Sequence, residues 1–390
     1  MHRRHCHNRW FGVVQQLRFG GMALLLTGGL TLVTGQLQAR AEDITVQTAQ
    51  QMREAPPWNP FAWKWTPTDV ELHKYRRSWN PMANGPILNT GVDVQPQEQF
   101  LFQPFLFGEF GHQVYGNRLS TASTDSKDHL QALAPTFIFA YGLTDNLEVD
   151  VIPAGASSLW WQDSHRAADG SSARSDAFGP GDTTIYVKNR LRVQDPYTWQ
   201  PTITQFHQLV LPSSQWLGTR GIPGGFSPLG RLPATKFGAL SYTEGLMFRK
   251  NFRPFRISAG AYYTYTVPGS NAGMNTYIGD IVNTRFIIEH ILNDEKGFGY
   301  NLEFVTLHQL PFRADGHPIN ISTIPGTNAH TLTLFGIEPA VQYKFFQSEH
   351  GALVAAAGVL FSVAGQNNIN AIYPNLSIYY YWSKGKVMMR

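Results

Sequence analysis

Charged side chains recur at every second position of the segment 182–193, DTTIYVKNRLRV. Successive side chains of an extended strand point to opposite faces, so this spacing separates a polar face from an aliphatic one. The polar face would carry Asp182, Thr184, Tyr186, Lys188, Arg190 and Arg192. Charges that leave water need partners. The segment therefore predicts a strand that borders a polar interior.

Carboxylates with the same spacing occur at Glu148 and Asp150, in the strand-like segment 146–152. As an antiparallel neighbour, this segment would place both acids beside the bases of the first one. Two later segments, 256–267 and 281–290, show the same alternation. The predicted inward face is formed by Glu148, Asp150, Lys188, Arg190, Arg192, Tyr262, Arg285 and Glu289. It would act either as an ion lattice that rigidifies the protein or as a charged constriction that selects solutes.

The strands that carry these residues are joined by alternately long and short connections. Polar links of many residues are predicted at 113–128, 153–181, 211–238, 267–276, 309–330 and 365–370. Short turns are predicted near 142–145, 194–201, 249–255, 291–297 and 346–351. An all-β transmembrane antiparallel barrel of about 12 strands, with long external loops and short periplasmic turns, has this pattern.

Eight further segments complete the count of strands. They are 98–112, 129–141, 202–211, 239–249, 298–308, 331–345, 352–364 and 371–382. The orientation of 202–211 and of 239–249 stays open, because both faces mix polar and apolar residues. Segment 352–364 could instead be a buried strand or a short helix. Pro339 predicts a bulge or a local bend in 331–345, since proline cannot donate to the ladder.

Residues 1–41 have the pattern of a secretory signal. Basic residues precede an apolar run from Phe19 to Val33, and Ala39-Arg40-Ala41 supplies a small-x-small cleavage pattern. Five of the 31 basic residues lie here, so the mature chain has 26 against 27 acidic residues. This balance gives no support to nucleic-acid binding. Export through this signal predicts the outer membrane of a Gram-negative bacterium as the destination of the barrel.

The barrel is expected to span 97–382, followed by a basic tail, 383–390. Aromatic residues near strand ends, such as Tyr141 and Trp160, predict the girdles found at membrane interfaces. The end of the last strand, Asn375–Trp382 (NLSIYYYW), closes on an aromatic residue, the terminal feature that the barrel assembly machinery reads.

Residues 42–96 differ from the rest of the chain because they are rich in proline and tryptophan. Proline excludes long helices and paired strands here. Two interpretations stay open: a periplasmic linker, or a plug that enters the lumen and stacks its indoles along the path of the solute. The plug residues would be Trp58, Trp63, Trp65 and Trp79.

Two motifs, Tyr141–Pro153 (YGLTDNLEVDVIP) and Gly179–Leu191 (GPGDTTIYVKNRL), resemble those of a known family. It is the outer-membrane β-barrel family described as channels of the phenol-degradation meta pathway. Pro201–Ser213 (PTITQFHQLVLPS) is similar to the next strand pair of that family, which ends in a Leu-Pro element. The resemblance implies a barrel that moves small hydrophobic or aromatic compounds across the outer membrane.

The function predicted is an outer-membrane channel or transporter for small solutes, with membrane lipid, solute and assembly machinery as partners. One alternative is a structural or adhesive surface barrel that acts through its long loops. Another is a lipid hydrolase using His207, His290 or His308 with Ser213 or Ser214, but no His-x-Ser-Asn-Gly pattern is present. We predict no catalytic residue, no metal and no cofactor; the oligomeric state stays open.

Overall fold

The computed structural model describes residues 66–83, 85–88, 91–166, 172–213, 240–271, 274–319 and 329–387. The chain divides into two units, Met1–Trp58 and Asn59–Arg390, and the described residues all belong to the second. The predicted signal, Trp58, Trp63, Trp65 and residues 388–390 lie outside them. Within the described ranges, no helix is both long and apolar enough to cross a membrane.

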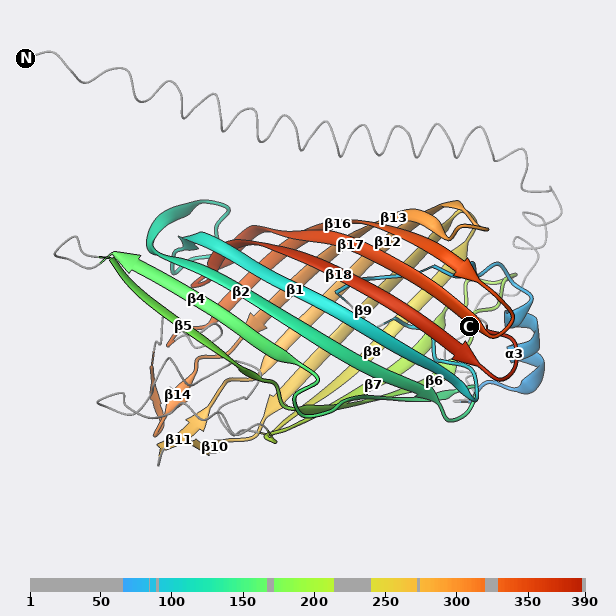
Figure 1. Ribbon diagram of the computed structural model, residues 1–390, viewed down its shortest axis with the longest axis horizontal. Coiled ribbons are helices and arrows are strands. Elements are labelled where there is room, and N and C mark those ends of the chain that lie inside the picture. Colours follow the sequence, from blue (N-terminus) through green and yellow to red (C-terminus); the bar gives the residue numbers. More distant parts are fainter. Residues whose placement is uncertain are drawn as a thin grey trace, which may run out of the picture. The chain divides into compact units, whose positions relative to one another are not determined.

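Twelve antiparallel strands close into a barrel, as the alternation of connections predicted (Figure 1). Each strand pairs with its neighbour around the barrel, and the first pairs with the last. The strands are β1 (Gln99–Tyr115), β2 (Ser123–Gly142), β3 (Leu147–Ile152), β6 (Thr183–Arg192), β7 (Thr202–Leu211), β8 (Ser241–Phe252), β9 (Phe255–Thr266), β12 (Ile281–Asn293), β13 (Phe298–Gln309), β16 (Leu332–Gln347), β17 (Gly351–Gln366) and β18 (Ile369–Ser383). All twelve predicted segments are therefore barrel strands, including 352–364.

The alternation of residue types in the strands sets which face is buried. In β16, Val341 and Phe345 are 57% and 62% exposed on the outer face, whereas Glu338 and Gln342 are buried inside. The outer face is apolar and aromatic, and the inner face is polar, as expected for strands with lipid on one side and a lumen on the other. The predicted bulge at Pro339 is wrong, because the pairing runs through Pro339 without a shift.

The long connection 153–181 is not the irregular loop that was predicted. It contains a hairpin, β4 (Ser158–Arg166) and β5 (Ser172–Pro180), which pairs with β2. The reason lies in the unequal lengths of the strands: β2 has 20 residues, but β3 pairs only with residues 139–142 of it. Residues 128–133 of β2 therefore have backbone N–H and C=O groups that β3 does not reach, and β4 of the hairpin pairs with them.

Two other predicted loops also contain strands. A small four-stranded sheet combines β10 (Gly269–Asn271), β11 (Met274–Tyr277), β14 (Arg313–Ala314) and β15 (His317–Pro318). The link 365–370, predicted to be long, is a turn at 367–368, because β17 and β18 extend beyond their predicted ends. Asn367 has φ +50°, a conformation that asparagine tolerates in turns.

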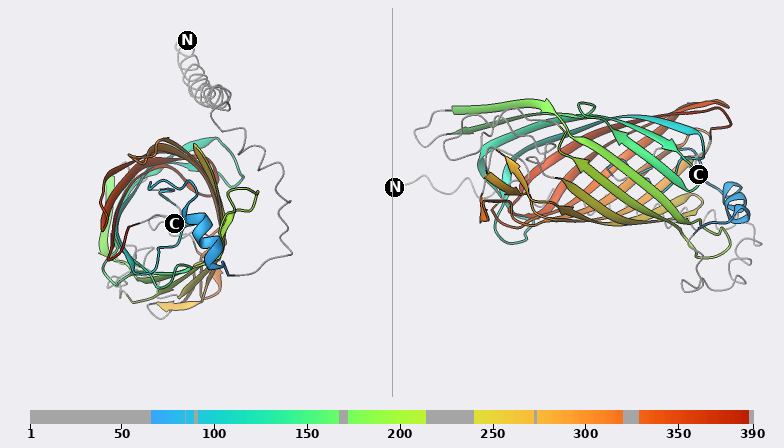
Figure 2. Two further views of the ribbon diagram at one scale, coloured as in Figure 1. Left: turned by 90° about the vertical axis from the view of Figure 1, so that its right-hand side faces the viewer. Right: turned by 90° about the horizontal axis from the view of Figure 1, so that it is seen from below.

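The part of the leader that the structure describes consists of a helix and an extended segment. Helix α3 (Asp69–Arg76) starts with a capping box, in which Thr68 and Glu71 bond each other's backbone N–H groups. The described residues of 80–95, which we call the lumenal segment, lie inside the barrel (Figure 2). Met82, Ile87 and Val92 are among its buried side chains.

Candidate functional site

The predicted inward residues all lie on the inner side of the barrel strands. Glu148, Asp150, Lys188, Arg190, Arg192 and Glu289 are buried there, and Tyr262 and Arg285 are half-buried. The pairing expected between β3 and β6 is present: Glu148 stands opposite Lys188, and Oε1 of Glu148 lies 2.6 Å from Nζ of Lys188. Arg190 and Arg192 have other partners, since they reach the leader and the short turns.

Inward carboxyl and amide groups accept the backbone N–H groups of the lumenal segment. The amide of Ile87 donates to Oε1 of Glu303 (2.5 Å), and that of Gly85 to Oε1 of Gln342 (2.8 Å). The amide of Gln95 donates to Oε2 of Glu148. These contacts come from β13, β16 and β3, on different sides of the barrel, and they fix the segment across the lumen.

Inward bases and a hydroxyl bind the carbonyl groups of the same segment. Lys188 Nζ donates to the carbonyls of Asp93 (2.9 Å) and Gly91 (3.4 Å). Arg190 Nη2 donates to the carbonyl of Val94 (3.2 Å), and Thr204 Oγ1 to that of Val92 (2.7 Å). The charged face of β6 therefore holds a peptide.

A buried ion network joins the segment to the wall at Asp93. Arg249 pairs with Asp93, and Tyr75 of α3 donates its hydroxyl to Oδ1 of Asp93 (2.8 Å). Glu289 lies between Arg249 (4.0 Å) and Arg256 (2.9 Å). Burial by itself would raise the pKa of Asp93, but the positive charges of Arg249 and Arg190 outweigh it and hold that pKa below its usual value. Asp93 is thus ionised and locked to the wall near neutral pH.

Helix α3 is tied to the short-turn end of the barrel. Lys74 pairs with Asp195 (2.8 Å). Arg76 pairs with Asp145. Trp79 donates its indole N–H to Oδ2 of Asp294 (3.1 Å). Trp79 is therefore held at a turn, and its indole is not stacked along the lumen.

The motif Tyr141–Pro153 has a role that turn chemistry alone did not suggest. A Cβ on Gly142 would lie 1.9 Å from the carbonyl oxygen of Pro96, so glycine leaves room for the chain to pass from the leader into β1. Asp145 accepts from the amide of Gln97 (3.3 Å) and, through its carbonyl, from Arg190 (3.0 Å). Residues of this motif therefore contact the chain at the point where the leader continues into β1.

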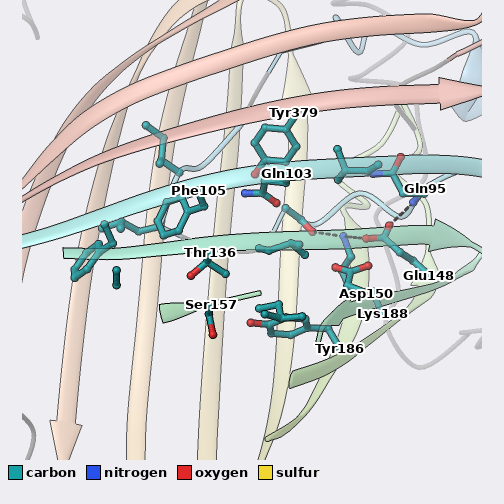
Figure 3. A pocket seen from close by; sticks show the side chains of 18 of the residues that line it. Gln95, Gln103, Phe105, Thr136, Glu148, Asp150, Ser157, Tyr186, Lys188 and Tyr379 are labelled. Carbon is teal, nitrogen blue, oxygen red and sulfur yellow. Dashed lines mark hydrogen bonds and ion pairs between the residues drawn. The ribbon is translucent and has the colours of Figure 1, made fainter. Parts of the chain in front are cut away.

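A cavity of about 560 Å³ lies between the lumenal segment and the wall formed by β1, β2, β3, β4, β6, β8 and β18. Glu148, Asp150 and Lys188 lie together at one end, and Phe105 lies toward the other (Figure 3). The apolar part of the lining includes Leu101, Phe105, Phe107, Ala132, Ala134, Ile138, Ile152 and Leu159. Pockets of this size with mixed lining hold small organic molecules.

Several residues of the site were not found from the sequence. Asp93 stands in a segment without periodicity, and Arg249 in a strand whose orientation the sequence left open. The structure turns Arg249, Met247 and Thr243 inward. Phe206, in the other strand of open orientation, also faces inward, and its ring meets that of the predicted Tyr262 edge-on at 5.6 Å. Phe105 was assigned to a strand but not to a pocket.

The histidines considered for hydrolysis are bound to tyrosine and threonine hydroxyl groups. His207 lies 2.6 Å from the hydroxyl of Tyr242, His290 lies 2.7 Å from that of Tyr300, and His308 lies 3.0 Å from that of Thr333. Ser213 bonds Thr183, and Ser214 lies outside the described residues. Among the residues that the structure describes, no group of three metal-ligating side chains comes together.

No protein-family model and no curated protein sequence matches the chain. Its fold is similar to the COG4313 outer membrane channel from Pseudomonas putida F1, with a TM-score of 0.55 and 11% identity over 75% of this chain and 99% of that one. The chain has the fold of an outer-membrane β-barrel. The Ralstonia pickettii toluene transporter TbuX (TM-score 0.31, 11% identity, 74% and 90% covered) and a mutant of the monoaromatic hydrocarbon channel TodX (0.33, 9%, 74% and 91%) are too distant to add an argument.

Proposed function

We propose that the protein is an outer-membrane channel that binds small, partly apolar solutes in its lumen and lets them cross. The observation that carries this proposal is the cavity of about 560 Å³ between the lumenal segment and the wall. A barrel with a purely structural role has no need of such a space beside a polar, ion-paired face, since a packed interior is more stable.

The outer face of the barrel supports a position in the membrane. Exposed side chains around the wall include Phe139, Tyr263, Phe286, Val341 and Trp382. Outward-facing apolar and aromatic side chains of this kind are covered by lipid in outer-membrane barrels. Together with the predicted export signal, this outer face supports the outer membrane of a Gram-negative bacterium as the location.

The lumenal segment makes the proposed channel a narrow one. Its backbone is bonded to β3, β6, β7, β13 and β16, so it crosses the lumen and divides it. Solutes that cross would pass through the cavity beside the segment. Motion of the segment would open the wider path.

The test is planar-bilayer conductance of refolded residues 42–390 beside a variant that lacks residues 42–96. We expect small conductance steps from the first protein and larger steps from the second. Folding of both is checked by β-sheet circular dichroism and by heat-modifiable migration in gels. Two properly folded, silent proteins would refute the channel and favour a surface barrel that acts through its loops.

A further inference from the structure

More acids than bases line the lumenal cavity. The lining contains the carboxyl groups of Asp93, Glu109, Glu148 and Asp150 and the bases Lys188 and Arg249. Arg249 is paired with Asp93, and Lys188 with Glu148. Neither of these two bases is ion-paired with Asp150 or Glu109.

Asp150 is the residue that marks a binding point. It is only 7% exposed and lines the cavity, and although its carboxyl group is hydrogen-bonded to Glu148, its Oδ1 has no hydrogen-bond partner among the described residues. Lys188 does not supply one, because its ammonium is directed to Glu148 and to two carbonyls of the lumenal segment. An ammonium has three donors, and these three acceptors use them. A buried carboxylate oxygen without a donor is costly, so a donor from a bound molecule would stabilise the site.

Aromatic rings lie on the same cavity. Tyr186 stands opposite Asp150 in the β3–β6 ladder. Tyr379 and Tyr381 line the cavity from β18, with their rings stacked at 6.0 Å. A carboxylate combined with ring faces is an arrangement that stabilises organic cations, since the faces carry partial negative charge.

We propose that the solute of this cavity is an amphipathic organic cation, with an ammonium group that donates to Asp150. Its aromatic or aliphatic body lies along the apolar wall near Phe105, Ile138 and Leu159. The assignment rests on the proposed channel function and names the class of solute for the same site. The volume of about 560 Å³ accommodates a body of one or two rings with its side chain.

Three solutes with nearly the same body test the charge directly on the full mature chain: 2-phenylethylammonium, 2-phenylethanol and phenylacetate. Binding is measured in detergent by calorimetry, and permeation by the swelling of proteoliposomes. We expect the cation to bind at least about tenfold more tightly than the alcohol, as a charge-assisted hydrogen bond provides. Phenylacetate should bind most weakly of the three.

The variant Asp150→Asn removes the charge and keeps the shape. We expect it to reduce the preference for the cation over the alcohol to within about threefold. Glu338→Gln is the matched control, because Glu338 is a buried inward carboxylate that does not line the cavity. Its preference for the cation should equal that of the unchanged protein.

Equal or tighter binding of the alcohol would overturn the proposal, and so would a full cation preference in Asp150→Asn. The solute comparison needs no variant, so it decides the matter even if Asp150→Asn fails to fold. Permeation of all three solutes at equal rates would support the channel function and refute only the preference for a cation. Absence of permeation, together with silent bilayers for the chain without residues 42–96, would remove the channel itself.

Discussion

The substitution Asp93→Asn should open the lumen by weakening the attachment of the lumenal segment. The new amide side chain would keep an acceptor for the hydroxyl of Tyr75 but lose the charge that pairs with Arg249. The side chain of Arg249 is only 2% exposed, so its charge would remain in a site of low polarity. Loss of one partner from a buried pair costs about 3 to 5 kcal/mol.

The lower end of that range is the expected value, because Glu289 remains 4.0 Å from Arg249 and offsets part of the loss. About 3 kcal/mol corresponds to a change of roughly 150-fold in the ratio of detached to attached segments. In planar bilayers near pH 7, the fraction of time spent in the larger conductance state should rise by up to this factor.

Asp195→Asn is the control for this prediction. Asp195 also pairs with the leader, through Lys74, but the two side chains are 28% and 41% exposed. An exposed pair contributes at most about 1 kcal/mol, so its loss should change the open fraction less than about sixfold. If folded Asp93→Asn conducts like folded Asp195→Asn, the ion pair at Asp93 does not hold the segment.

Acid should act in the same direction as Asp93→Asn. The pKa of Asp93 is lowered in the folded protein, so its stabilising effect is complete above the ordinary carboxyl pKa of about 3.9. The effect is lost as the pH falls through the lowered pKa. The unchanged protein should therefore open in strong acid, and in Asp93→Asn this part of the pH response should be missing.

Other predictions concern the wall of the barrel. Gly245→Val should lower stability by about 1 to 3 kcal/mol, because a Cβ at Gly245 would lie 2.3 Å from the ring of Tyr262. Gly351→Ala is its control, since the nearest atom there is 3.6 Å away, and both are measured by denaturant unfolding in vesicles. Phe286→Lys should destabilise by about 2 to 4 kcal/mol in the same assay, as Phe286 is 43% exposed near the middle of β12. An unchanged unfolding midpoint for Phe286→Lys would mean that this face is not covered by lipid.

The barrel could be predicted because its information is local. In β6, polar and aliphatic residues alternate, and this alternation shows which face of the strand is turned inward. The antiparallel pairing with β3 then places Lys188 opposite Glu148. The hairpin β4–β5 escaped the prediction for a different reason. Its pairing depends on residues 128–133 of β2, which β3 is too short to reach. No pattern within 153–181 indicates this pairing.

The site was only half predictable, because the lumenal segment has no pattern of its own. The described residues of the segment do not pair with a strand of the barrel. Their backbone groups are hydrogen-bonded to side chains that are far away in the sequence. Asp93 and Arg249 are 156 positions apart, and Ile87 and Glu303 are 216 apart. The sequence indicated the inward charges but not that many of them bind a peptide.

The contacts of the lumenal segment also constrain the order in which the protein assembles. The segment is synthesised before every strand, yet Gln342, which accepts the amide of Gly85, lies in β16, the third strand from the end. No partly built sheet can offer all of its partners, because they surround it. The segment can therefore make all of these contacts only when the strands that surround it are in place, so its complete seating belongs to a late step of assembly.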